Sequence, residues 1–466
     1  MERFISLIGI LVFFGLAYLL SVDRRAIQWR TVVWGFALQF LFGVFVLRTG
    51  VGFHLFNGIG NLVTAFLNFS DAGAEFVFGE NFRDIFFAFK VMPTVIFFSA
   101  FISLLYYYGI LQRLVSGIAW VMQRTMKTSG PETTSCAANI FVGQTEAPLL
   151  IKPFINHLTE SELHAVMVGG FATVAGSVLA AFIGFGLSAQ ALISATVMNA
   201  PGALAISKIV YPELERSRYR SNRKERSAVL PVNRREHTKS LGDEIAGPNP
   251  GAPAATMARY PNDDVGRDID PDANTEDVIE ERLQEDEEIK SEQSIDNPIA
   301  AIADGAIQGM KLVLNIIAIL IAFLALIAFL NAILGWLGGL VGFPQLSLEW
   351  LLSLLLAPLA FLMGVPWQDA GQVGVLLGKR TIINEFVAYV DLRGMVEARA
   401  ISERSILIAT FALCGFANIS SIGQQIGGIG GIAPKRIPDL AKLGFRAMLT
   451  GTLCNFITAA IAGLLL

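Results

Sequence analysis

Long apolar runs alternate with short polar segments along the chain. A helix needs about 20 predominantly apolar residues to cross a bilayer, at a rise of about 1.5 Å per residue. The runs that reach or approach this length cover residues 4–20, 31–47, 91–111, 165–186, 191–210, 312–333 and 447–466, and a further run starts at residue 406. The pattern predicts an all-α polytopic membrane protein with about eight transmembrane helices.

Two stretches depart from this pattern in the same way. Residues 130–148 and 364–386 contain polar interruptions between weakly apolar segments that are too short to cross. Each stretch is followed by an apolar run that is broken, at residues 173–177 and 415–421, and then by a closing run. We therefore predict two re-entrant helical hairpins in an inverted repeat with broken helices, an arrangement that marks a transporter site near the membrane midplane.

Three other segments are expected outside the apolar interior. Residues 48–84 have mixed polarity and are expected on the outer side, whereas residues 118–127 are amphipathic and basic and are expected to lie along the inner surface. Residues 423–433, after the second broken run, read as a glycine-rich exit.

Charge is scarce, and its placement predicts the orientation. Of the 466 residues, 16% are charged and 53% are hydrophobic, whereas a soluble domain is about one quarter charged. Arg24, Arg25 and Arg30 follow the first apolar run, so we expect a retained helix whose end is cytoplasmic, rather than a signal peptide. The chain is thus expected in the plasma (inner) membrane as a multi-pass protein with both termini outside.

The segment 211–297 has a different composition from the rest of the chain. It begins basic and ends strongly acidic, around residues 276–288. Its apolar content is too low to offset the entropy of ordering, so we expect a mostly disordered cytoplasmic insertion, with a short acidic helix possible near 278–289. The segment is either a regulatory, partner-binding tail or a tolerated loop expansion.

Two glutamates stand in apolar surroundings where the helices break. Glu146 and Glu385 would each cost about 2.5–3.5 kcal/mol at the centre of a membrane helix, which favours a functional role over a structural pair or a place near the interface. Asn418, Ser420 and Ser421 add amide and hydroxyl groups at the second break. Carboxylates, amides and hydroxyls suit a neutral, hydroxyl-rich ligand rather than a phosphate.

Other classes of function find less support in the sequence. The spans contain no Ser/His/Asp order, HExxH motif or aspartate pair, so an embedded enzyme is disfavoured, and neither a cofactor nor a nucleic-acid partner is expected. A channel is a third alternative, and uncoupled, non-saturating flux would identify it. Cys136, Cys414 and Cys454 show no metal-binding spacing and are expected to be small buried residues.

Three long motifs stand out in the chain: NIFVGQTEAPLLIKPF at 139–154, GKRTIINEFVAY at 378–389 and CGFANISSI at 414–422. They resemble motifs of the concentrative nucleoside transporters, in the sodium-coupled bacterial and animal-type branch. The match runs in order over nearly the whole chain except the insertion. Arg380 stands where the family pattern has lysine, and the planar guanidinium places its donors differently.

The resemblance implies a set of site residues. The nucleobase is expected to contact Gly143, Gln144, Thr145 and Glu146, with Val178 as apolar packing. The ribose is expected to contact Glu385, Asn418 and Ser421, with Phe416 beside them. A Na+ ion is expected at the side chains of Asn139 and Thr173 and at the backbone carbonyls of Val142 and Val174.

The resemblance also implies a mechanism and an organisation. The chain is expected to be a nucleoside symporter that works by alternating access and forms a homotrimer in the lipid bilayer. Its coupling ion is Na+, or alternatively H+ carried by Glu146 or Glu385. The expected segments are 1–127 (largely scaffold), 128–210 (first repeat of the transport domain), 211–297 (insertion), 298–345 (scaffold or oligomerisation helix) and 346–466 (second repeat).

Overall fold

The computed structural model describes residues 2–83, 86–214, 297–340, 342–343 and 345–466, and all regular structure in these residues is helical. The insertion beyond residue 214, including the acidic helix predicted at 278–289, lies outside the described residues. Eight helical stretches are long and apolar enough to cross a membrane, which confirms the predicted class. They are Glu2–Leu19, Trp29–Arg48, Gly50–Phe78, Phe89–Tyr107, Glu160–Gly184, Ala189–Val210, Pro298–Leu340 and Pro434–Leu465.

The first repeat follows the predicted order of a hairpin, a broken helix and a closing helix. Its elements are α7 (Gly130–Ala138), η4 (Ala147–Ile151), α8 (Lys152–Ile155), α9 (Glu160–Ala172), α10 (Gly176–Gly184) and α11 (Ala189–Val210). At the start of α9, Thr159 and Glu162 form a complete capping box, and at the start of α7 the Glu132 carboxylate accepts from the Ser129 backbone N–H at 2.8 Å.

The second repeat has the same order. Its elements are α15 (Leu348–Leu362), α16 (Trp367–Ile382), α17 (Glu385–Glu397), α18 (Glu403–Leu413), α19 (Ile419–Ile432) and α20 (Ile437–Leu465). The chain bends by 115° between α15 and α16, as a broken or re-entrant pair does. The glycine-rich segment after the second break is not an exit from the helix, because it forms most of α19.

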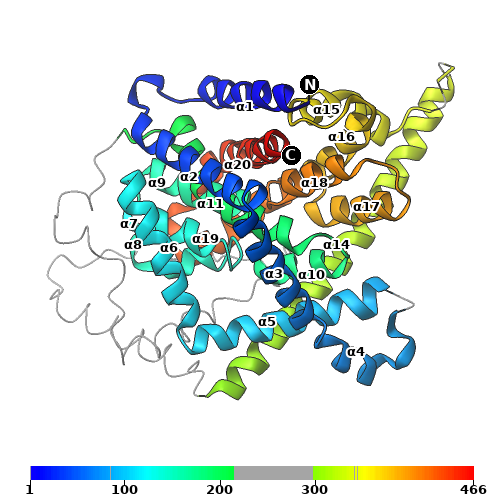
Figure 1. Cartoon of the computed structure of the whole chain (residues 1–466), viewed down its shortest axis with the longest axis horizontal. Helices are drawn as coiled ribbons and strands as arrows, with labels where there is room; N and C mark the ends of the chain where they lie inside the picture. Colours follow the sequence, from blue (N-terminus) through cyan, green and yellow to red (C-terminus); the bar gives the residue numbers. More distant parts are fainter. Residues whose placement is uncertain (1, 84–85, 215–296, 341, 344) are drawn as a thin grey trace, which may run out of the picture.

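The central helices come from both repeats, and the outer helices from the rest of the chain. Helices α9, α11 and α20 are largely buried and pack against one another. In Figure 1, α20 lies between α1 (Glu2–Leu19) and α11, and α2 (Trp29–Arg48) packs along α11. Helices α5 (Met92–Tyr107) and α14 (Pro298–Leu340) pack against each other and expose most of their surface, as lipid-facing or subunit-facing helices do.

Residues 48–84, which the sequence analysis places on the outer side, are largely helical. They form α3 (Gly50–Leu67) and α4 (Ser70–Phe78), which together have the length and composition of a membrane span. The predicted amphipathic helix is α6 (Ile110–Met126), which begins earlier than predicted, directly after Gly109 in its left-handed conformation. All three cysteines are buried, as expected.

Candidate functional site

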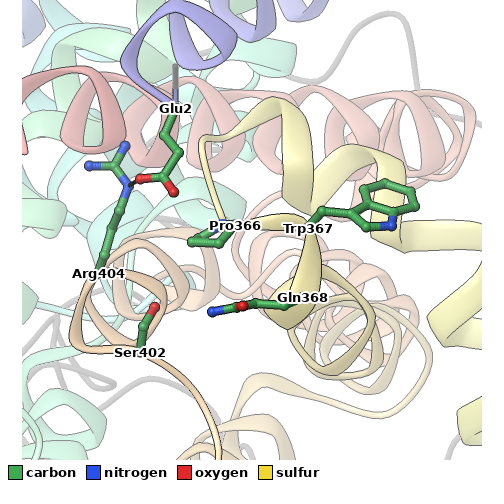
Figure 2. A pocket seen from close by; sticks show the side chains of 6 residues that line it. All are labelled: Glu2, Pro366, Trp367, Gln368, Ser402 and Arg404. Carbon is green, nitrogen blue, oxygen red and sulfur yellow. Dashed lines mark ion pairs between the residues drawn. The ribbon is translucent and has the colours of Figure 1, made fainter.

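A surface pocket lies away from every predicted site residue. Figure 2 shows it where the starts of α1, α16 and α18 meet, with the ion pair between Glu2 and Arg404 at 3.1 Å on one wall. Its lining residues are Glu2, Pro366, Trp367, Gln368, Ser402 and Arg404. The candidate site is therefore defined by polar groups that converge inside the fold, not by this pocket.

The two helix breaks meet at a symmetric crossing of hydrogen bonds. Asn199 on α11 and Asn455 on α20 each donate to the carbonyl of Ala172 at 2.7 Å and to the carbonyl of Cys414 at 2.9 Å. These two carbonyls lie at the C-terminal ends of α9 and α18, where they have no donor within their own helix. Each repeat therefore supplies one asparagine that donates to both helix ends. Gly415 permits the close approach, because a Cβ there would lie 2.6 Å from Asn455 Oδ1.

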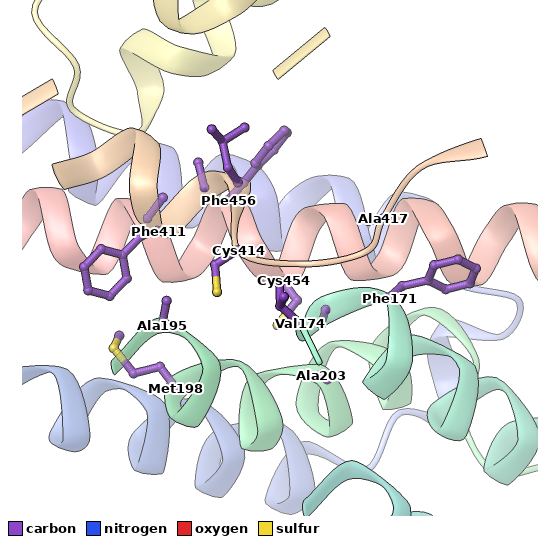
Figure 3. Packing of buried hydrophobic residues seen from close by; sticks show 14 of the residues in the cluster. Phe171, Val174, Ala195, Met198, Ala203, Phe411, Cys414, Ala417, Cys454 and Phe456 are labelled. Atoms are coloured by element: carbon purple, nitrogen blue, oxygen red, sulfur yellow. The ribbon is translucent and has the colours of Figure 1, made fainter. Parts of the chain in front are cut away.

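The unwound segments beyond the crossing are also joined. The backbone N–H of Phe416 donates to the carbonyl of Thr173 at 3.2 Å, which links the residues that follow the two helix ends. Figure 3 shows the segment from Cys414 to Ala417 running alongside α20, with Val174 close by among buried apolar side chains. Backbone without helical partners is tolerated at this depth because the protein itself satisfies it.

Glu385 lies at the start of α17 beside the start of α19. Its carboxylate accepts a hydrogen bond of 2.8 Å from the Asn418 amide, and only 6% of the residue is exposed. Asn418 also caps α19, since its Oδ1 accepts from the Ser421 N–H at 2.8 Å and from the Ser420 hydroxyl at 2.7 Å. The positive ends of two helices thus face one carboxylate, an arrangement that stabilises its charge. Asn418 thus joins Glu385 to Ser421, and these are the three residues that the sequence analysis assigns to the ribose.

Gln144, at the tip of the first hairpin, is held by two glutamines of α19. Its Nε2 donates to Gln424 Oε1 at 2.8 Å, and its Oε1 accepts from Gln425 Nε2 at 3.0 Å. Gln425 is fully buried and also donates to the Met167 carbonyl at 3.1 Å. Sequence reasoning missed Gln424 and Gln425, although a glutamine pair within an apolar, glycine-rich stretch was an available signal.

The other predicted base-side residues surround this tip. Gly143 is buried, and a Cβ there would clash with the Glu146 carboxylate. The Glu146 side chain is exposed, unlike that of Glu385. Thr145 packs closely against Gly428 of α19, and Val178 is buried in α10. The tip residues therefore meet α19 through Gln144 and Thr145, while the Glu146 carboxylate lies over Gly143.

The residues predicted to bind Na+ carry or adjoin buried oxygens that have no hydrogen-bond donor among the described residues. Asn139 follows the last residue of α7, and its Nδ2 donates to the Ser135 carbonyl at 3.1 Å. Asn139 Oδ1 and Ser135 Oγ are buried and have no hydrogen-bond partner among the described residues. Thr173 Oγ1 donates to the Gly169 carbonyl at 2.8 Å, which leaves its lone pairs available. Neutral oxygens with unused lone pairs suit a hard monovalent cation, so the residues fit Na+.

The base of the first hairpin holds a buried charge cluster. Lys208, near the end of α11, lies 2.7 Å from Glu132 and 3.8 Å from Glu213 and donates to the Ser161 hydroxyl at 2.9 Å. Burial raises the pKa of the Glu213 carboxyl, and Lys208 opposes that shift. The cluster ties the starts of α7 and α9 to the end of α11, so it anchors the hairpin from which Gln144 and Asn139 project.

Models of known families match three parts of the chain. They are the Na+ dependent nucleoside transporter C-terminus at residues 250–463, its N-terminus at residues 8–81, and a nucleoside recognition (gate) region at residues 88–189. The three matches follow one another along the sequence and together span most of it.

Individual relatives agree with these models. The chain is 41% identical to sodium/nucleoside cotransporter 1 of Mus musculus over 477 residues and 39% identical to solute carrier family 28 member 3 of Homo sapiens. All of the chain is covered in both comparisons, but it spans only 64% and 60% of these relatives. CNTnw in an inward-facing substrate-bound state is 36% identical, with a TM-score of 0.81 and coverage of 100% of this chain and 98% of that one. The chain therefore belongs to the concentrative nucleoside transporter family.

Proposed function

We propose that this protein is a secondary active symporter that imports nucleosides together with Na+. The observation that carries the proposal is the buried Glu385 carboxylate, which two helix starts and the Asn418 amide hold beside the crossing of the two breaks. A nucleoside offers vicinal hydroxyl donors to such a carboxylate, and hydrogen bonds to a charged acceptor are roughly twice as strong as neutral ones.

The two ends of the nucleoside would be recognised by different repeats. Asn418 and Ser421 add an amide and a hydroxyl next to Glu385, with Phe416 alongside, for the ribose. Gln144 offers an amide whose orientation is fixed by Gln424 and Gln425, which suits the ring edge of a base. Gly143, Thr145, Glu146 and Val178 complete the proposed base side.

The coupling ion would use the first repeat. Asn139 and Thr173 supply side-chain oxygens, and Val142 and Val174 supply carbonyls near the helix ends. The bond from Phe416 N–H to the Thr173 carbonyl connects this region to the segment that carries Asn418. Binding of a cation would order Thr173, and through this bond it would favour the ordered form of the segment that carries Asn418. Cation binding and nucleoside binding would then stabilise each other, which is a physical route for coupling.

A moving domain and a scaffold would carry out alternating access. We assign the repeats at 128–210 and 346–466 to the transport domain and the long helix within 298–345 to the scaffold of a homotrimer. Helices α1 and α2 pack against α20 and α11, so the contacts favour a smaller scaffold than residues 1–127 as a whole. Both termini would face outward in a plasma (inner) membrane, and the insertion at 211–297 would be cytoplasmic, on the side of Arg24 and Arg25.

Uptake of radiolabelled uridine into proteoliposomes tests this function. We expect saturable accumulation driven by an inward Na+ gradient and abolished when choline replaces Na+. Uptake that persists in choline and collapses with a protonophore would assign H+ as the coupling ion instead. Flux that neither saturates nor accumulates would indicate a channel and contradict symport.

A further inference from the structure

Arg380 is a fully buried cation in the second repeat. It lies in the last turn of α16 and has no exposed surface. Its guanidinium donates to the carbonyl of Ala412 at 3.0 Å, to the carbonyl of Gly415 at 3.3 Å and to Asn455 Oδ1. One side chain thus donates to the last turn of α18, to the break that follows it and to Asn455 on α20.

No carboxylate neutralises this charge at ion-pair distance. Across the described residues, the ion pairs of the protein do not include Arg380. Its acceptors are carbonyls at a helix C-terminus and one amide oxygen, and a helix C-terminus carries about half a negative charge. The charge of Arg380 is therefore balanced by backbone dipoles at hydrogen-bonding distance, and by the Glu385 carboxylate acting from beyond ion-pair distance.

The first repeat has oxygens without donors at the matching place. Asn199 and Asn455 bond the same two carbonyls at the same two distances, so the breaks after Ala172 and Cys414 are equivalent by the internal symmetry. In the second repeat, Arg380 extends from α16, the first helix of that repeat's hairpin, to the break after Cys414.

In the first repeat, the corresponding hairpin helix, α7, ends at Ala138, and Asn139 follows it. Asn139 Oδ1, together with the nearby Ser135 Oγ, has no donor within the described chain. One repeat therefore carries its own cation, whereas the other presents lone pairs to an external one.

We propose that the Arg380 guanidinium is a tethered cation, which performs in the second repeat the structural role that the coupling cation performs in the first. Uptake of the coupling ion would then be confined to the first repeat, and removing the guanidinium would open a second cation site beside Gly415 and Asn455. This inference rests on the proposed Na+ site at Asn139 and Thr173. Arginine suits the role because its planar fork reaches acceptors on three segments, whereas the single ammonium of lysine cannot serve all three in the same geometry.

Chemical rescue of Arg380→Ala tests the proposal. Uptake and thermal stability of the purified protein would be measured with millimolar guanidinium, and with urea as an uncharged molecule of the same shape. We expect uptake to fall at least tenfold and guanidinium, but not urea, to restore it at least threefold. In the same variant, raising Na+ at constant ionic strength should increase the melting temperature more than in the unmodified protein, because a second cation can bind.

Two further variants cover the case in which Arg380→Ala does not fold. Arg380→Lys keeps the charge, and Arg380→Met keeps most of the length without charge, so the lysine variant should yield more folded, monodisperse protein. Equal or better folding of the methionine variant, or rescue by urea as well as by guanidinium, would overturn the tethered cation.

A failure of the Na+ site itself would be recognised separately. In that case the protein with Arg380 intact would transport without Na+, or Asn139→Ala would leave the Na+ dependence unchanged. Neither result depends on the Arg380 variants, so the two hypotheses can fail independently.

Discussion

The two repeats share one architecture but place their charges differently. In the first repeat, the glutamate of the hairpin, Glu146, is exposed, and Asn139 Oδ1 and Ser135 Oγ are buried without a donor among the described residues. In the second repeat, Glu385 is buried and bonded, and the buried carbonyls near the break receive Arg380. The two repeats thus present different side chains to the same geometry of helix breaks.

The largest expected effect concerns the two crossing asparagines. Asn455→Leu should destabilise the protein by about 2–4 kcal/mol, because each unsatisfied buried polar group costs about 1–3 kcal/mol and Asn455 also accepts from Arg380. Asn199→Leu is the matched control, because the side-chain oxygen of Asn199 accepts from the neutral Thr458 hydroxyl instead of from an arginine. We expect it to lower the free energy of unfolding by about 1–2 kcal/mol. Thermal unfolding in detergent measures both, and equal losses would mean that Arg380 does not distinguish the repeats.

The two hairpin glutamates give the next largest contrast. Glu385→Gln should weaken nucleoside affinity by about 1.5–3 kcal/mol, the range for hydrogen bonds to charged groups. The loss should shrink for 2′,3′-dideoxynucleosides, which lack the hydroxyl donors. Glu146→Gln, at the exposed position, should cost less for the same ligands.

Binding of labelled nucleosides to purified protein measures these differences. Equal weakening of ribonucleosides and dideoxynucleosides, or merely less folded protein, would make Glu385 a structural residue and remove the ribose assignment.

The cation residues give a smaller effect that should be specific to Na+. Asn139→Ala should raise the Na+ concentration for half-maximal uptake about tenfold, which corresponds to about 1.4 kcal/mol. Ser135→Ala, which removes an unpartnered hydroxyl next to it, should raise that concentration less. Uptake titrated with Na+ at constant ionic strength provides the measurement. A drop in maximal uptake without any change in Na+ dependence would argue against the site.

The smallest effect is expected from the segment that neither repeat contains. Deleting residues 225–290 should leave nucleoside affinity within about threefold, or less than about 0.7 kcal/mol, because their composition gives them no place in the membrane. Competition binding with the deletion variant tests this. A tenfold loss in well-folded protein would show that the insertion acts on the site.

Several features of the site could be predicted because they violate the usual composition of a membrane helix. Glu385 and Asn418 interrupt apolar runs, and an ionisable group in such a run needs a partner. Gln424 and Gln425 escaped notice because the surrounding glycines resemble a loop, although tertiary contacts hold them in α19.

The partners of Arg380 could not be predicted from any sequence pattern. Two of its three acceptors are backbone carbonyls, and every residue type carries that group. Which carbonyls lose their helical donors depends on where α18 ends and on how the two breaks face each other, and both are properties of the assembled fold. Sequence could identify a charge in an apolar setting but not its counterpart.

The crossing also has a consequence for biosynthesis. Ala172 belongs to α9, which emerges from the ribosome before α20, yet one of the two donors to its carbonyl is Asn455, in α20. During translation the first repeat must wait in the bilayer with its break only half satisfied, and hydrocarbon offers no water to complete it. Helix α20 therefore completes the fold of the first repeat as well as its own, and a chain stalled before Asn455 should be recognised and degraded by membrane quality control.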